Sequence, residues 1–230
     1  MLSQVLYNRM IRETELPVNQ PNKPAVERAV VYIDGFNLYF GMRSAGYLRY
    51  FWLDLQELAG GLLRTGQELR CTKYFTSRIA GPSDKQKRQS TYLDALGTLD
   101  ESRFRMAFGK YQNNSTTCSH CGRIFSVSNE KMTDVNIAVA MMEDAFRDEF
   151  DTAFLVSADS DLCGSVRAIR RLFPSKRVVV AFPPARRSAE LANDASATIV
   201  IGRGKLANYQ FPDVVCGKND FPLRRPQEWA

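Results

Sequence analysis

The sequence predicts a three-layer α/β/α domain with a mainly parallel central sheet. Short apolar runs of strand length, such as residues 30–33 and 153–156, alternate along the chain with amphipathic segments of helix length. This alternation is typical of right-handed βαβ units, whose helices cover both faces of a sheet. The length of 230 residues and the hydrophobic fraction of 44% suit one such domain with appendages.

The expected elements follow in order along the chain. The first helix starts near Phe36, and Ser83 is a plausible N-cap of the third helix. Pro174 ends the helix expected at 162–172. The expected strands cover 28–34, 68–75, 104–108, 152–157, 177–182 and 198–201. The expected helices after the first cover 53–63, 83–99, 133–146, 162–172 and 188–193.

Segments outside these elements divide the chain further. Residues 1–26 contain three prolines and are interpreted as an N-terminal arm. The main domain is expected over 27–202, with a small polar, cysteine-containing insertion at about 111–130. The tail, 203–230, contains four large aromatic residues and is expected to pack back on the domain.

Composition indicates a cytoplasmic protein without a membrane partner. No segment is apolar for long enough to span a bilayer, and the N-terminus lacks the apolar stretch of a secretory signal. Five cysteines without a disulfide framework favour a reducing compartment. Cys71 and Cys163 fit buried apolar positions.

Charge and histidine content narrow the chemistry. A net charge of +6 favours a polyanionic partner such as nucleic acid, although an ordinary basic protein fits equally well. The single histidine, His120, excludes acid–base schemes that need two histidines. Acidic residues with a metal are therefore the better source of catalysis.

Two of the apolar strands run directly into acidic residues. Asp34 follows the first strand, and Asp159 and Asp161 follow the fourth. In open α/β sheets, ligands gather outside the carboxyl ends of the strands. Each aspartate also has a structural interpretation, an Asp-Gly turn for the first and a helix N-cap for the others. One aspartate is enough for a cap, so the second remains to be explained.

A third segment contributes Asp134. This residue begins the apolar stripe of the helix expected at 133–146, although a first-turn acid is also favoured by the helix dipole. The stripe contains Asp134, Ile137, Ala138, Met141, Met142 and Ala145. Together, the four aspartates could hold one or two Mg²⁺ or Mn²⁺ ions, with a metal-activated water as the nucleophile.

Three motifs in this order resemble the NYN domain, in particular the LabA-like group of the PIN-like nuclease superfamily. They are Asp34-Gly35-Phe36-Asn37, Lys131-Met132-Thr133-Asp134-Val135 and Ser157-Ala158-Asp159-Ser160-Asp161. The resemblance covers about 28–202 and implies a PIN-like fold that cleaves RNA with metal ions. It implies that Asp34, Asp134, Asp159 and Asp161 are the catalytic metal ligands, that Asn37 positions substrate or a metal water, and that Ser157 supports the pocket.

Basic residues follow several expected strands and could hold phosphates around the acidic pocket. Lys131, three residues before Asp134, and Arg186, which follows the strand expected at 177–182, are the two we expect to bind substrate. The wider set consists of Arg78, Lys110, Arg187, Arg203 and Lys205. For any single member, solvated surface charge is the simpler interpretation.

The cysteine pair in the insertion has three interpretations. Cys118 and Cys121 form half of a zinc knuckle, but no second Cys-x-x-Cys follows. The pair therefore indicates a Zn²⁺ site, a degenerate ribbon, or a ligand set that another chain completes.

The sequence predicts a metal-dependent endoribonuclease acting on single-stranded RNA. The alternatives are an RNA-binding regulatory module with weak or no turnover, and a DNA nuclease or phosphatase on a related acidic fold. Haloacid-dehalogenase-type phosphatases require a second aspartate where Phe36 stands, and Toprim domains expect glutamate at Asp34. The sequence is also compatible with a homo-oligomer.

Overall fold

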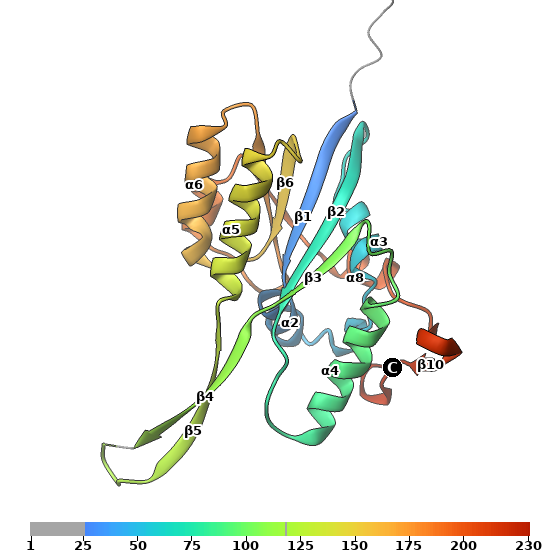
Figure 1. Ribbon diagram of the computed structural model, residues 1–230, viewed down its shortest axis with the longest axis vertical. Coiled ribbons are helices and arrows are strands. Elements are labelled where there is room, and N and C mark those ends of the chain that lie inside the picture. The colour runs from blue at the N-terminus through green and yellow to red at the C-terminus, as the bar shows by residue number, and fades with distance from the viewer. Residues whose placement is uncertain (1–25, 118) are drawn as a thin grey trace, which may run out of the picture.

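A six-stranded parallel sheet forms the centre of the protein, in the order β3-β2-β1-β6-β7-β8. The computed structural model describes residues 26–117 and 119–230. It confirms the predicted α/β architecture with helices on both faces (Figure 1). The sheet strands are β1 (Glu27–Asp34), β2 (Gln67–Thr76), β3 (Phe104–Phe108), β6 (Thr152–Val156), β7 (Arg177–Phe182) and β8 (Ala197–Val200).

Side chains of β1 alternate between two hydrophobic cores, which explains why this strand is apolar without interruption. Ala29, Val31 and Ile33 pack into one core, and Val30 and Tyr32 pack into the other. The first core lies under α2 (Gly35–Ser44), α3 (Leu55–Gly60), α4 (Ser83–Leu96) and α8 (Arg203–Asn208). The second lies under α5 (Thr133–Phe146), α6 (Cys163–Leu172) and α7 (Ala189–Asp194).

The strand order reverses between β1 and β6. Successive strands β1, β2 and β3 proceed toward one edge of the sheet, whereas β6, β7 and β8 proceed toward the other. The connections that leave β1 and β6 therefore diverge at their carboxyl ends. Such a switch point is the usual ligand-binding position of an open parallel sheet.

An antiparallel hairpin projects from the body between β3 and α5 (Figure 1). It consists of β4 (Lys110–Thr117) and β5 (Ile124–Lys131), and it occupies the region for which the sequence predicts a polar insertion. Met132 connects the hairpin to α5 with a φ of 80°, in the left-handed region. The chain thus turns sharply just before Asp134.

The C-terminal segment lies against the first core. It contains α8, β9 (Val214–Cys216), β10 (Pro222–Arg224) and the 3₁₀ helices η3 (Lys218–Asp220) and η4 (Gln227–Trp229). The Trp229 ring packs against Phe51 and Trp52, with ring centroids 5.7 and 6.4 Å away. The Trp52 indole nitrogen donates to the Pro212 carbonyl at 2.8 Å. No described helix is long and apolar enough to cross a membrane.

Two local expectations were wrong. The helix expected at 53–63 begins only after Asp54, because the Asp54 carboxylate accepts hydrogen bonds from the Gln56 and Glu57 amides and caps α3. Ser83 is not an N-cap but the first residue of α4, preceded by Pro82. The expected N-terminal arm, 1–26, lies outside the described residues apart from its last.

Candidate metal and nucleic-acid site

Asp34 lies at the carboxyl end of β1 and is 3% exposed. Its Oδ1 accepts from the Asn37 amide at 2.9 Å, which makes Asp34 the N-cap of α2. Its Oδ2 accepts from the Ser157 hydroxyl at 2.9 Å. Burial raises the pKa of Asp34, the two hydrogen bonds oppose that change, and the nearby Asp159 charge adds to it. The carboxylate is thus fixed in one orientation.

The loop after β6 brings two further aspartates to the same edge. Ser157 is fully buried, and its hydroxyl oxygen accepts from the Asp159 amide at 3.1 Å while donating to Asp34. Asp159 caps η2 (Ser160–Leu162) by accepting from the Asp161 amide at 3.0 Å. Asp161 is exposed and caps nothing, so its carboxylate is free to face a ligand.

Asp134 lies in the first turn of α5 and is partly buried. Its pKa is raised to about 6, first by desolvation and then by the negative charges of Asp34, Asp159 and Asp161. Three separate segments therefore bring Asp34, Asp159 and Asp161 close enough to destabilise the charged form of Asp134. Repulsion of this kind is relieved by protonation or by a bound cation.

Asn37 and Arg186 join this edge to the loop after β7. The Asn37 side-chain oxygen accepts from the Ala158 amide at 3.2 Å and from Arg186 Nη1 at 3.3 Å. The guanidinium of Arg186 also lies over the Phe40 ring, 5.8 Å from its centroid. Arg186 is therefore a positioned cation beside the acidic residues.

The other predicted residues lie elsewhere or are described only in part. Lys131 is the last residue of β5, and its side chain lies outside the described part, as does the whole of Cys118. Cys121 is exposed. Lys205 donates to the Gly61 carbonyl beside α3, and the Arg203 guanidinium donates to the Tyr50 hydroxyl at 3.1 Å, so neither is directed at the acidic edge.

The donor set suits a hard divalent ion that keeps much of its hydration. Carboxylate oxygens are the ligands Mg²⁺ and Mn²⁺ prefer, and Mg²⁺ usually binds only one or two carboxylates directly. Among the described residues, no three His, Cys, Asp or Glu side chains converge to coordinate one ion together. The carboxylates therefore fit an ion bound partly through water, which Asp34, Asp134, Asp159 and Asp161 would hold.

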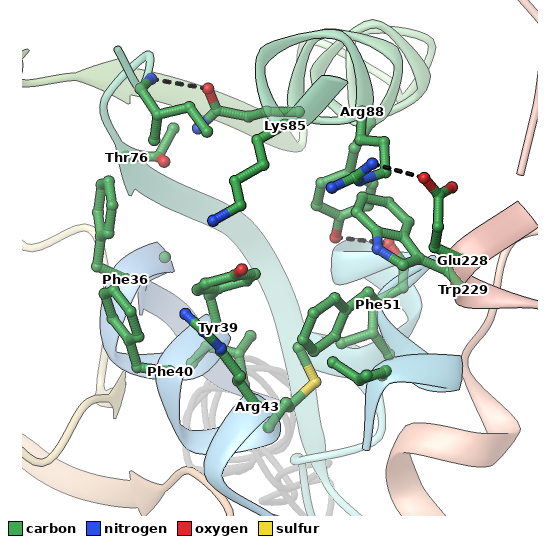
Figure 2. A pocket seen from close by; sticks show the side chains of 18 of the residues that line it. Phe36, Tyr39, Phe40, Arg43, Phe51, Thr76, Lys85, Arg88, Glu228 and Trp229 are labelled. Carbon is green, nitrogen blue, oxygen red and sulfur yellow. Dashed lines mark hydrogen bonds and ion pairs between the residues drawn. The ribbon is translucent and has the colours of Figure 1, made fainter. Parts of the chain in front are cut away.

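Sequence reasoning missed a group of aromatic residues on α2. Phe36, Tyr39 and Phe40 line a cavity of about 450 Å³ between α2, α4 and the C-terminal segment (Figure 2). Their spacing of three and four residues places them on one helix face, which is the signal that could have revealed them. Tyr39 and Phe40 are more than a third exposed.

Sequence reasoning also missed a buried polar group between the sheet and α5. Asp144 of α5 accepts from the Tyr32 hydroxyl at 2.5 Å and from Lys73 at 2.7 Å. Asp144 continues the inward stripe of α5, so its position was readable from the sequence. Its bonds cross from α5 to β1 and β2, and they indicate a structural role under the sheet.

Comparisons with known proteins agree with this fold. The chain is 28% identical over 240 aligned positions to the 6-hydroxy-3-succinoylpyridine 3-monooxygenase HspA of Pseudomonas putida (strain DSM 28022 / S16), with 88% of this chain and 75% of that protein covered. A crystal structure of a Vibrio parahaemolyticus protein of unknown function has a TM-score of 0.52 and 21% identity, covering 82% of this chain and 98% of that one. The latter likeness concerns the fold alone.

The family assignment rests on a match that spans most of the chain. The model of the NYN domain matches residues 28–202, which includes β1, the hairpin, α5 and the loop after β6. All four aspartates and Asn37 lie within the matched region. The chain therefore belongs to the NYN domain family, a branch of the PIN-like nuclease superfamily.

Proposed function

We propose that the protein is a metal-dependent endoribonuclease that cleaves single-stranded RNA, and that it belongs to the LabA-like group of NYN proteins. The observation that carries the proposal is the gathering of four carboxylates at the switch point, where burial and the charges of the other three raise the pKa of Asp134 to about 6. Structural aspartates gain partners on folding, whereas this one gains three like charges. An arrangement that costs stability without a ligand is typical of a functional site.

Each residue has a distinct part in this proposal. The Ser157 hydroxyl holds the Asp34 carboxylate and the Asp161 amide holds that of Asp159, so these two carboxylates need no reorganisation when substrate arrives. Arg186, held by Asn37, binds a phosphate of the RNA. A divalent ion, when bound, supplies water of lowered pKa and offsets phosphate charge. Lys131, three residues before Asp134, is the second phosphate-binding residue we propose.

The test is cleavage of mixed single-stranded RNAs by the full chain with Mg²⁺ or Mn²⁺, followed by addition of EDTA. Asp34→Asn, Asp159→Asn and Asp161→Asn each remove one carboxylate charge and are expected to reduce cleavage at least about 100-fold. Asp161 is exposed, so its variant separates lost chemistry from lost folding. Asp94→Asn, an exposed change on α4, is the matched control. Intact RNA with both metals refutes the catalytic proposal.

The same assay ranks the alternatives. A regulatory RNA-binding module would retain RNA in a salt-dependent manner without cutting it. A DNA nuclease or a phosphatase would cleave single-stranded DNA or p-nitrophenyl phosphate in preference to RNA. Equal amounts of the three substrates in one metal titration distinguish these outcomes.

A second candidate function concerns small aromatic acids. The Pseudomonas relative is named for an oxygenation of 6-hydroxy-3-succinoylpyridine, a ring with an anionic chain. The aromatic cavity with Lys85 beside it is the observation that favours a ligand of this shape here. Incubation with that compound, oxygen and a two-electron reductant, with mass spectrometry for a product one oxygen atom heavier, tests this candidate.

A further inference from the structure

A deep aromatic cavity opens beside the acidic edge. Its walls come from α2, from the loop after β2, from α4 and from η4, segments that lie far apart in the sequence (Figure 2). The cavity volume of about 450 Å³ lies in the range of small-molecule sites. Seven aromatic residues line it, namely Phe36, Tyr39, Phe40, Phe51, Tyr74, Tyr92 and Trp229.

The rings form a continuous series that runs from the surface of α2 to the first core. Phe36 and Phe40 have centroids 6.2 Å apart, Tyr39 lies 5.0 Å from Phe51, and Phe51 lies 5.7 Å from Trp229. Figure 2 shows Phe36 and Phe40 on one side of the space and Phe51 on the other. The faces of Tyr39 and Phe40 are exposed, and such faces gain free energy when another planar ring covers them.

Some polar groups around the cavity have partners within the protein, whereas two cations belong to no ion pair. Arg88 pairs with Glu228 at 2.6 Å, and the Tyr92 hydroxyl donates to the Leu53 carbonyl. In the part of the chain that the structure describes, Lys85 and Arg43 belong to no ion pair, and Figure 2 shows the Lys85 ammonium directed into the space between the aromatic walls. The cavity thus offers aromatic faces together with two cations that lack an anion.

We propose that this cavity binds a planar aromatic ring that carries an anionic group, with the ring against Phe40 and Tyr39 and the anion at Lys85. A nucleotide unit of a single-stranded RNA has this chemistry, and so does a free aromatic acid. The nucleotide is the source we favour, because Arg186 contacts both Asn37 of the acidic edge and the Phe40 ring. In that form the inference rests on the proposed function and adds a base-binding subsite to it.

The test measures binding of mononucleotides, which contain no phosphodiester to cleave. Trp229 lines the cavity and the second tryptophan, Trp52, is fully buried, so quenching of intrinsic fluorescence reports occupancy. The full chain in EDTA is titrated with AMP and UMP, with the nucleosides adenosine and uridine, and with pyridine-3-carboxylate. Calorimetry provides the affinities independently of the fluorescence.

Matched variants locate the site. Lys85→Gln removes the unpaired cation and is expected to weaken nucleotide binding about tenfold, with little effect on the nucleosides. Phe40→Leu is expected to weaken nucleotides and nucleosides alike, by about fivefold or more. Lys87→Gln, on the same helix but outside the cavity lining, and Phe146→Leu, at an exposed position of α5, are the controls and should leave affinity unchanged.

The outcomes are distinguishable from those of the cleavage assay. Binding of AMP or UMP that depends on Lys85 supports the nucleotide source even if no RNA is cut. Binding of pyridine-3-carboxylate alone supports the free aromatic acid as the source. If no ligand binds in the millimolar range, or if Lys85→Gln and Lys87→Gln behave alike, the proposal is overturned, although the acidic edge could still cleave RNA.

Discussion

Ser157 donates a hydrogen bond to Asp34 across the point where the strand order of the sheet reverses, with 2.9 Å between the two oxygens. The same hydroxyl oxygen accepts from the Asp159 amide, so one small side chain connects the ends of β1 and β6. Both partners are almost fully buried. The Ser157 hydroxyl therefore fixes the Asp34 carboxylate relative to the main chain at Asp159.

Replacing Ser157 with alanine is expected to reduce cleavage about 10- to 100-fold and to destabilise the fold by about 1–3 kcal/mol. The buried Asp34 carboxylate would lose one of two donors, and the Asp159 amide would lose its acceptor. RNA cleavage and urea denaturation measure the two effects. Ser160→Ala changes an exposed serine of the same loop and is the control. Unchanged cleavage in Ser157→Ala would show that the bond does not position the site.

Replacing Arg186 with glutamine is expected to weaken RNA binding and to reduce the slope of log affinity against log salt by about 1. The reason is the loss of one cation that Asn37 holds beside the acidic edge. Arg187→Gln is the matched control, because the Arg187 guanidinium lies over Phe182 instead. Filter binding at several salt concentrations in EDTA measures both. Equal salt slopes for the two variants would argue against phosphate binding by Arg186.

Asp134→Asn is expected to stabilise the metal-free protein at pH 7.5 but not at pH 5. The folded pKa of about 6 lies above the ordinary value of 3.8, so the native state binds the proton more tightly. Stability from this group is complete below pH 4 and is lost as pH rises through 6. After solvent screening the gain is about 1 kcal/mol, or roughly 2–4 °C in Tm. Thermal melts in EDTA at both pH values, with Asp94→Asn as control, measure it.

Addition of Mn²⁺ is expected to reverse that order of stability. A cation bound by the native carboxylates raises Tm with its concentration, because at 100 times its Kd it adds about 2.7 kcal/mol to the free energy of unfolding. The rise should be larger at pH 7.5 than at pH 5, because Asp134 is mostly protonated at the lower pH. Asp134→Asn should lose much of the rise while Asp94→Asn keeps it. An equal rise in both variants would place the ion elsewhere.

The sheet and its acidic edge were predictable because both depend on local patterns. Each strand that ends in aspartate is a contiguous run, and the parallel βαβ topology brings those ends to one edge. Asp134 could be included because helical periodicity assigns it to the inward stripe of α5. Asn37 required the motif, since nothing in its local pattern indicates that it would accept from Arg186, 149 positions later.

The aromatic cavity could not be predicted in the same way. Phe51 and Trp229 meet only because the C-terminal segment returns to the first core, and neither belongs to a periodic pattern that includes the other. From the sequence, only the helical spacing of Phe36 and Phe40 on α2 could indicate that these residues share a face. Packing between distant segments, rather than propensity, decides such contacts.

Ion pairs at the amino-terminal ends of the strands make stability depend on pH with the opposite sign to Asp134. Arg28 pairs with Asp148 at 2.9 Å and with Asp151 at 2.8 Å, and Lys176 pairs with Asp148 at 2.5 Å. Hydrogen bonds from Lys176 and Arg28 lower the pKa of Asp148, and one from Arg28 lowers that of Asp151. Carboxylates of this kind stabilise the fold above their unfolded pKa, and that stability is lost as pH falls through the folded value.

Asp148→Asn is therefore expected to lower Tm at pH 7, to have less effect near pH 3, and to leave RNA cleavage unchanged. Asparagine tolerates the left-handed φ of 57° at this position, so the change removes charge without adding backbone strain. Thermal melts across pH 3–7 and the RNA assay provide the two readouts. The ion pairs of Asp148 lie at the amino-terminal ends of the strands, whereas Asp34 lies at the carboxyl end of β1. A loss of cleavage at a temperature where the variant is folded would therefore show that the two ends of the sheet are coupled.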